Sequence, residues 1–312
     1  MPSQKTQNSD RALAAQITHA ASQQTYLTIR LLADSKRIDD AYRAYAYFRW
    51  VDNWLDEPGC PDPERLAFLQ RQQRLITADG NKSRESAELN PVPEENLALD
   101  LLEREPDKAS GLHAYFNNLM AVMEFDTRRR HRLISAHELS SYTHWLAVAV
   151  TEAMHYFIGQ KCRSPPSARR YFAVSGAHIT HMLRDTLDDL ATGYYNIPRE
   201  VLEAGKIEAD DVSSPAYREW VQRRVELARG CYRASRSYLA RVESLRCRVA
   251  AFAYMHRFEG VLDCIEQDGY LLRTEYPEQK RLGLELISWA MWMALQAPAM
   301  DHAARTLRRA QY

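Results

Sequence analysis

Apolar residues recur at three- and four-residue spacing along nearly the whole chain, with charged residues between them. This spacing predicts helices, and alternating strand-like runs bounded by turns are absent from the sequence. Glycine, which would interrupt helices, occurs only 11 times in 312 residues. The long helices predicted from the pattern cover residues 41–55, 110–125, 140–158, 168–191, 217–242 and 247–272.

The breaks between these helices do not resemble interdomain linkers. They fall at residues 58–63, 79–93, 164–166, 196–198, 213–215 and 277. A chain of this length can bury a large core as one unit. We therefore expect a single all-α domain over residues 21–300, preceded by a flexible segment (1–20) and followed by a tail (301–312).

Charge and cysteine usage restrict the class of protein. The 41 basic and 41 acidic residues balance, so no global positive field favours nucleic acid, and any phosphate binding must be local. The five cysteines are widely spread with no Cys-x-x-Cys, which indicates free thiols in a reducing compartment. The polar N-terminus lacks the apolar run of a signal peptide. We expect a cytoplasmic protein with no nucleic-acid partner.

The most apolar stretch, residues 286–300, is shorter than the roughly 20 residues that span a bilayer. A buried terminal helix is the favoured interpretation. Peripheral association with a membrane surface is the alternative.

Two pairs of carboxylates in the sequence indicate a metal-binding site. The chain contains only two Asp-x-x-x-Asp pairs, and each follows an arginine: Arg49 with Asp52 and Asp56, and Arg184 with Asp185 and Asp189. Residues four apart share a helix face, so each pair places two like charges together, at a cost of about a few tenths of a kcal/mol. A Mg²⁺ ion, held by a few carboxylates and completed by substrate phosphates, would remove that cost.

The first pair belongs to a longer stripe. Counting back from Asp56 along its helix face gives Asp52, Arg49 and Tyr45. Large apolar residues surround the stripe on several sides, so the helix is expected to be buried, and buried charges must be paired or bind a metal. A solvated charged face is the alternative.

The second pair extends in the same way through His181 to His178. His181, one turn before Asp185, could join a metal shell, and the two histidines with Asp185 could also bind a transition metal. They could equally be polar groups of the core. Arg184 could reach a phosphate or simply neutralise Asp185.

The position of the second pair in its helix favours a cation. Gly193 is a natural helix terminator, and Pro198 prevents the helix from resuming. Asp185 and Asp189 therefore lie in the last turns, where the helix dipole disfavours carboxylates. Motifs for other chemistries, such as Gly-x-Gly-x-x-Gly, a P-loop, Gly-x-Ser-x-Gly or His-Glu-x-x-His, are absent from the sequence.

At these motifs the sequence resembles the squalene and phytoene synthase family of head-to-head prenyltransferases, from about Tyr26 to Leu284. The matching pieces are residues 45–52 with Asp56, residues 182–185 with Asp189, and residues 196–198. Tyr142 falls where the family places a cavity tyrosine. Each piece alone is weakly specific, but their order and spacing together are quite specific.

The resemblance implies an all-α isoprenoid-synthase bundle whose central cavity is flanked by two Asp-rich motifs. It implies prenyl diphosphate substrates, more than one Mg²⁺ ion, and coupling of two prenyl chains through a cyclopropyl intermediate. The residues that it assigns, with His181 added from the stripe, form three groups: the metal ligands Asp52, Asp56, Asp185, Asp189 and His181; the catalytic residues Tyr45, Arg49, Tyr142 and Arg184; and the diphosphate-binding residues Arg49, Arg184 and Arg273.

Several positions depart from the family's usual residues. His178 and His181 stand where the family has glutamine and asparagine, and Val148 and Thr151 stand where it has two small glycines. Phe258 replaces a tyrosine. Glu275 replaces an arginine, although Arg273 is two residues away. The groups for the first diphosphate are thus intact, while those for later steps are altered.

These departures leave alternatives open: a terpene cyclase or atypical prenyltransferase, a non-catalytic assembly protein of the same fold, or a transition-metal protein. NADPH also stays open, because a cavity without a nicotinamide fingerprint can bind it. A monomer and a homodimer are both compatible with the sequence.

Overall fold

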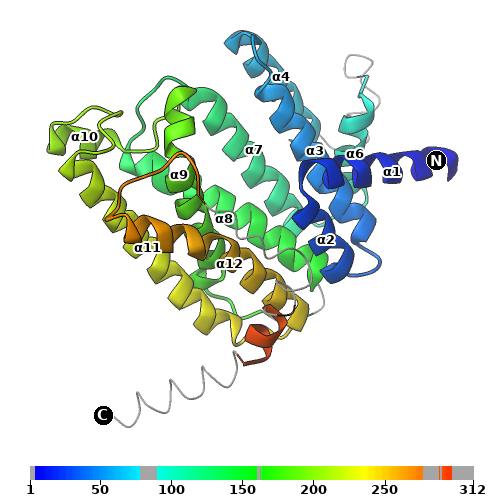
Figure 1. The fold of residues 1–312 in the computed structure, drawn as a ribbon. Coiled ribbons are helices and arrows are strands. Elements are labelled where there is room, and N and C mark those ends of the chain that lie inside the picture. Colours follow the sequence, from blue (N-terminus) through cyan, green and yellow to red (C-terminus); the bar gives the residue numbers. More distant parts are fainter. Residues whose placement is uncertain are drawn as a thin grey trace. The chain divides into compact units, whose positions relative to one another are not determined.

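The computed structural model describes residues 4–77, 90–159, 162, 164–276, 288 and 290–296. The regular elements in these ranges are all helices (Figure 1), which confirms the all-α prediction. They are α1 (Gln4–Ala21), α2 (Gln23–Leu32), α3 (Ile38–Leu55), α4 (Asp62–Thr77), α6 (Pro93–Glu103), α7 (Gly111–Arg129), α8 (Ala136–Ile158), the 3₁₀ turn η1 (Ala168–Tyr171), α9 (Phe172–Ala191), α10 (Arg199–Gly205), α11 (Pro215–Leu239) and α12 (Leu245–Gln267).

The chain divides into two compact units. Unit 1 comprises residues 1–127 and 152–160, and unit 2 comprises residues 128–151 and 161–312, so α7 and α8 each contribute to both. The single domain over residues 21–300, with a flexible segment before it, stays a prediction. The tail (301–312) and part of the apolar stretch (286–300) lie outside the described residues.

Helix α3 lies at the centre of unit 1, where it packs against α1, α2 and α6. Its Tyr47 and Phe48 rings meet Phe116 of α7 at centroid distances of 5.7 and 5.0 Å. The Tyr47 hydroxyl donates to Gln72 Oε1 at 3.0 Å. This face is buried as the sequence predicts, since Tyr47 is 1 % and Phe48 3 % exposed.

Unit 2 is built around α9, which packs against α11 and α12 (Figure 1). The approach of α9 to α11 is close because Gly176 has no side chain. A Cβ atom at this position would lie only 2.8 Å from the Tyr232 ring. The Tyr232 hydroxyl lies 3.4 Å from Thr180 Oγ1, one turn further along α9.

The predicted end of α9 is confirmed. The helix ends at Ala191, and Gly193 follows with φ +87°. The predicted helices over 168–191 and 247–272 differ in their bounds from the structure. The first begins as the 3₁₀ turn η1, and α12 stops at Gln267 because Gly269 and Tyr270 both have positive φ.

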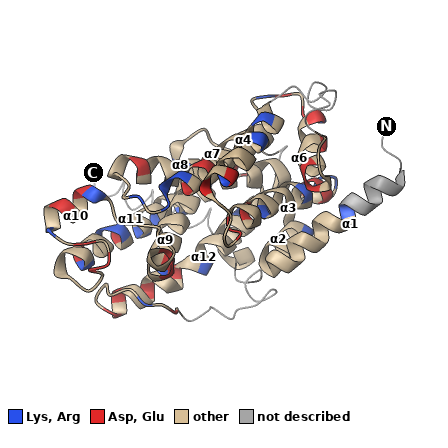
Figure 2. Cartoon of the chain, turned by 90° about the horizontal axis from the view of Figure 1, so that it is seen from above, with Lys and Arg blue, Asp and Glu red and all other residues tan. Residues whose placement is uncertain are grey.

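Surface and thiol features complete the description. Basic and acidic residues are both distributed over the helices (Figure 2), as the balanced composition suggests. All five cysteines are free, as predicted. Within the described ranges, no helix has the length and apolar character needed to cross a membrane.

Candidate functional site

The first stripe lies at the C-terminal end of α3. Arg49 Nη1 and Asp52 Oδ2 are 2.9 Å apart, and their side chains are 42 % and 36 % exposed. Asp56 caps the helix and is exposed, while Tyr45 is half-buried one turn before Arg49. The structure therefore brings the four residues of this stripe together at a surface of unit 1.

The ionised form of the Asp52 carboxylate is disfavoured by its surroundings. Its pKa is raised to about 6, first by burial and then by the charge of Asp56, while Arg49 opposes the rise. Asp126, near the end of α7, adds a further negative charge. Asp126 is not among the residues that the sequence pattern singles out, because only packing brings it near Asp52. This surface of unit 1 favours a cation.

The second stripe lies in the last turns of α9 and carries its own positive charges. Arg184 donates to both carboxylate oxygens of Asp185, at 2.5 and 2.9 Å. His181 Nε2 lies 2.8 Å from Asp185 Oδ2. Burial alone would raise the pKa of Asp185, but these hydrogen bonds hold it well below its usual range. Of the two roles considered for Arg184, the structure shows the pairing with Asp185, and His181 adds a contact to the same carboxylate.

Asp189 has a different environment. Asn196 Nδ2 donates to Asp189 Oδ2 at 2.6 Å, and Asn196 Oδ1 accepts from Arg129 Nη1 at 3.0 Å. Burial raises the pKa of Asp189, and both Asn196 and Arg129 counter this rise. Asn196 belongs to a motif that the sequence singled out, but its contact with Asp189 was not predicted. Arg129 was missed, because its neighbouring arginines resemble a solvated basic run.

His178 is a buried histidine without hydrogen-bond partners. It is 3 % exposed, and neither ring nitrogen makes a hydrogen bond among the described residues. Its ring meets the Tyr142 ring edge-on at 4.7 Å. Burial, aided by the charges of His181, Arg224 and Arg129, lowers the pKa of His178 well below its ordinary value. His178 is therefore a neutral core group.

The remaining predicted residues lie further along unit 2. Arg273 follows α12 and pairs with Asp268. Phe258 is buried on α12 and meets His181 edge-on at 6.1 Å. No group of three or more His, Cys, Asp or Glu side chains that could hold a metal ion occurs among the described residues.

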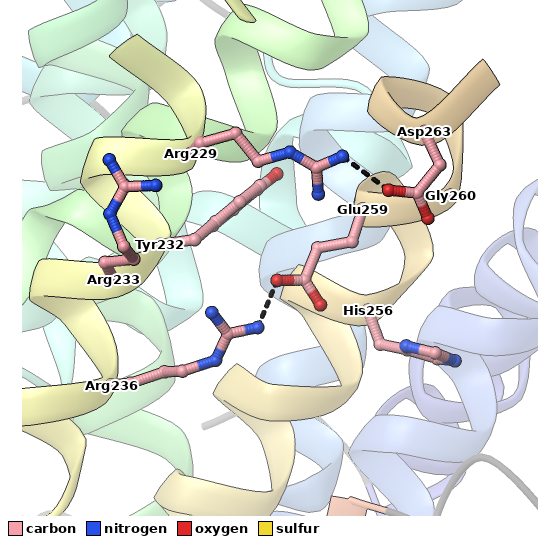
Figure 3. Close-up of a pocket in the computed structure, with 8 residues that line it drawn as sticks. All are labelled: Arg229, Tyr232, Arg233, Arg236, His256, Glu259, Gly260 and Asp263. Carbon is pink, nitrogen blue, oxygen red and sulfur yellow. Dashed lines mark hydrogen bonds and ion pairs between the residues drawn. The ribbon is translucent and has the colours of Figure 1, made fainter. Parts of the chain in front are cut away.

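Two cavities of unit 2 contain none of the predicted site residues. One, of about 330 Å³, lies between α11 and α12 (Figure 3). Its arginines Arg229 and Arg236 point to Asp263 and Glu259 of α12, with which they pair. The other, of about 650 Å³, is lined by His131, Leu190 and Tyr195 among others. The paired charges of the first cavity connect the two helices.

Comparison with known proteins gives a clear assignment. The model of the squalene/phytoene synthase family matches residues 18–285, which is most of the chain. The chain belongs to the squalene/phytoene synthase family. The family predicted from the sequence is thereby confirmed.

Solved structures of related synthases share the fold of this family member. Squalene synthase HpnC from Alicyclobacillus acidocaldarius is 17 % identical, with a TM-score of 0.64, and the match covers 86 % of this chain and 97 % of that one. A dehydrosqualene synthase in complex with a ligand is 14 % identical, with a TM-score of 0.68 and coverage of 93 % and 96 %. TcSQS with a ligand is 14 % identical, with a TM-score of 0.62 and coverage of 94 % and 90 %. No curated protein sequence matches the chain.

The family assignment allows the donor set to be tested against Mg²⁺, on which the squalene/phytoene synthase family typically depends. Mg²⁺ prefers oxygen ligands, keeps several waters, and is usually held by one or two carboxylates plus substrate phosphates. Each stripe of this synthase-family chain offers two carboxylates four residues apart. The ligand chemistry of the first stripe therefore fits Mg²⁺ bound together with a diphosphate, while in the second stripe both oxygens of Asp185 accept from Arg184 and Asp189 is the carboxylate that fits.

Proposed function

We propose that this member of the family is a Mg²⁺-dependent prenyltransferase. It ionises an allylic prenyl diphosphate and couples the prenyl chain head-to-head with a second one. The observation that carries the proposal is the stripe on α3, where Asp52 keeps a raised pKa beside Asp56 and Arg49. A carboxylate pair that is disfavoured without a cation is what a metal–diphosphate site requires.

The charged residues of the two stripes have distinct roles in this proposal. Asp52 and Asp56, and likewise Asp185 and Asp189, would hold Mg²⁺, which as a Lewis acid stabilises the departing diphosphate. Arg49 is half-exposed, so its guanidinium can turn from Asp52 to a phosphate oxygen. A guanidinium presents a fork of donors that matches phosphate geometry.

Arg184 differs from Arg49 because it is bound to Asp185 through two hydrogen bonds. It keeps Asp185 ionised and contributes a positive charge beside the leaving diphosphate. The phenols of Tyr45 and Tyr142 would donate hydrogen bonds as negative charge develops on the leaving group. Buried rings such as Phe258 would keep water from the carbocation and offer it a π-face.

The decisive experiment is product analysis. Purified protein would be incubated with farnesyl or geranylgeranyl diphosphate and Mg²⁺, with and without NADPH, and the products identified by mass spectrometry. We expect a coupled hydrocarbon or a cyclopropyl diphosphate. A cyclised product from one prenyl chain would instead indicate a terpene cyclase and overturn head-to-head coupling.

A matched pair of variants tests whether the carboxylate of Asp52 is needed for the reaction. Asp52→Ala should lower diphosphate release at least about 100-fold, because it removes a proposed metal ligand. Asp62→Ala, at an exposed acidic residue of α4, should leave the rate within about twofold. Equal rates for wild type and Asp52→Ala would support the non-catalytic assembly protein.

A further inference from the structure

A buried row of contacts connects Tyr142 of α8 with Asp189 of α9. The Arg129 guanidinium lies over the Tyr142 ring, 5.2 Å from its centroid. Arg129 Nη1 donates to Asn196 Oδ1 at 3.0 Å, and Asn196 Nδ2 donates to Asp189 Oδ2 at 2.6 Å. Tyr142, Arg129 and Asn196 are 7 %, 5 % and 1 % exposed. All four residues belong to unit 2, so the row lies within one compact body.

The amide of Asn196 can adopt only one orientation in this row. Its oxygen accepts from Arg129, while its nitrogen donates to Asp189 and, at 3.2 Å, to the Met182 carbonyl. In a flipped amide the NH₂ group of Asn196 would face the N–H groups of Arg129, and its oxygen would face the carboxylate oxygen of Asp189. Neither contact would be a hydrogen bond. Arg129 therefore determines which end of Asn196 faces the carboxylate.

Arg129 is itself held in place by two rings. Its guanidinium lies 4.9 Å from the Tyr194 centroid, in addition to its position over Tyr142. Contacts of a buried guanidinium with aromatic faces are favourable, and more so where water is excluded. The two tyrosines thus fix the guanidinium that orients Asn196.

The two oxygens of Asp189 are used differently. Oδ2 accepts the hydrogen bond from Asn196, whereas Oδ1 has no hydrogen-bond partner among the described residues. We propose that Asn196 and Arg129 are positioning residues, which hold Asp189 so that Oδ1 is presented to a divalent cation, and that the ring of Tyr142 supports them. This inference rests on the proposed function, in which Asp189 is a Mg²⁺ ligand.

Direct metal binding tests the proposal without requiring turnover. Mn²⁺ would replace Mg²⁺ as an EPR-visible probe in the presence of inorganic diphosphate. An Asp52→Asn background would remove a ligand of the first stripe. Asn196→Ala should raise the Mn²⁺ dissociation constant about 10- to 100-fold, the usual effect of losing a group that orients a metal ligand. The control Asn118→Ala, whose amide nitrogen donates to Ala114 O on α7, should leave the dissociation constant within about twofold.

Substitutions at Tyr142 separate positioning from a general loss of structure. Measured without diphosphate, to which the Tyr142 hydroxyl is proposed to donate, Tyr142→Phe should reduce Mn²⁺ affinity less than Tyr142→Leu, because it keeps the ring over which Arg129 lies. Tyr142→Leu removes the ring and should weaken it severalfold, as should Arg129→Gln. Thermal unfolding of each variant would show whether it is folded at the assay temperature.

The possible outcomes distinguish this inference from the proposed function. Unchanged Mn²⁺ affinity in folded Asn196→Ala and Arg129→Gln proteins would overturn the positioning role, even if the wild type couples prenyl diphosphates. A parent protein that binds no Mn²⁺ at the second stripe would overturn it as well. Weakened Mn²⁺ binding in a protein that forms no coupled product would support the positioning role and contradict the proposed reaction.

Discussion

The guanidinium of Arg184 binds both carboxylate oxygens of Asp185, its immediate neighbour in the sequence, at 2.5 and 2.9 Å. Both side chains are more than two-thirds buried. The pKa of Asp185 stays well below its usual range, so the carboxylate is ionised over the whole physiological range. A carboxylate whose pKa is lowered on folding adds stability above its unfolded pKa, and that stability is lost in acid.

Removing this guanidinium should therefore destabilise the protein at neutral pH. We expect Arg184→Gln to lower the free energy of unfolding by about 1–3 kcal/mol, because a half-buried charge loses its partner. Arg223→Gln is the matched control, since Arg223 pairs with Glu219 on the exposed surface of α11. Its effect should stay within about 0.5 kcal/mol. Urea denaturation at pH 7 in EDTA measures both, and equal effects would contradict the importance of burial.

Asp52 should behave in the opposite way to Asp185. Its pKa is raised to about 6 in the folded protein, so its ionised form destabilises the fold as the pH rises through about 6. In EDTA at pH 7, Asp52→Asn should raise the free energy of unfolding by up to about 1 kcal/mol, after allowing for solvent screening of a side chain one-third exposed. The gain should vanish near pH 4. A variant less stable than wild type at pH 7 would refute this electrostatic description of the stripe.

The buried His178 gives the fold a pH dependence. Because its folded pKa is lowered, protons bind preferentially to the unfolded chain, and stability falls as the pH drops below about 6.5. His178→Leu should remove up to about 1.4 kcal/mol of this loss per pH unit, and it removes two buried ring nitrogens that make no hydrogen bond among the described residues. The exposed His137→Leu should leave the pH profile unchanged. Thermal unfolding between pH 5 and 8 would detect the difference, and parallel profiles for both variants would contradict it.

The contact of α9 with α11 predicts opposite effects for two glycines. A Cβ atom at Gly176 would lie 2.8 Å from the Tyr232 ring, so Gly176→Ala should destabilise the protein by about 1–3 kcal/mol. At Gly230 of α11 a Cβ atom would meet only Arg233 Nη2, at 3.9 Å. Gly230→Ala should therefore stabilise the helix by about 0.5–1 kcal/mol. The denaturation midpoints of the two variants measure these effects. If both midpoints rose, or both fell, the packing argument would be refuted.

Six of the long helices, and the end of α9, were predictable from the chain alone. Apolar spacing predicted α3, α7, α8, α9, α11 and α12, and glycine and proline marked where α9 ends. These features are local, because periodicity and backbone preference act within a few residues. The family could also be inferred from the sequence, since the order and spacing of its motifs are read along the chain.

What surrounds each carboxylate was decided only by the tertiary structure. In the sequence, Asp52 and Asp185 are equivalent members of two similar pairs. Packing places Asp126 near Asp52 and raises its pKa, whereas Asp185 is held in its ionised form by Arg184 and His181. Whether a neighbouring cation points to a carboxylate or to solvent depends on burial and side-chain direction, which residue spacing does not specify.

The same holds for Asp189. The motif containing Asn196 was visible in the sequence, but Arg129 stood in a run of arginines without any sign of burial. Only the folded chain places its guanidinium against Asn196 and over two tyrosine rings. The sequence by itself determined a helical chain with two pairs of carboxylates, whose motifs resemble those of the squalene/phytoene synthase family. Arg184, next to Asp185 in the chain, compensates that carboxylate, whereas contacts between residues distant in sequence decided the surroundings of Asp52 and Asp189, because electrostatic environment depends on distance in space.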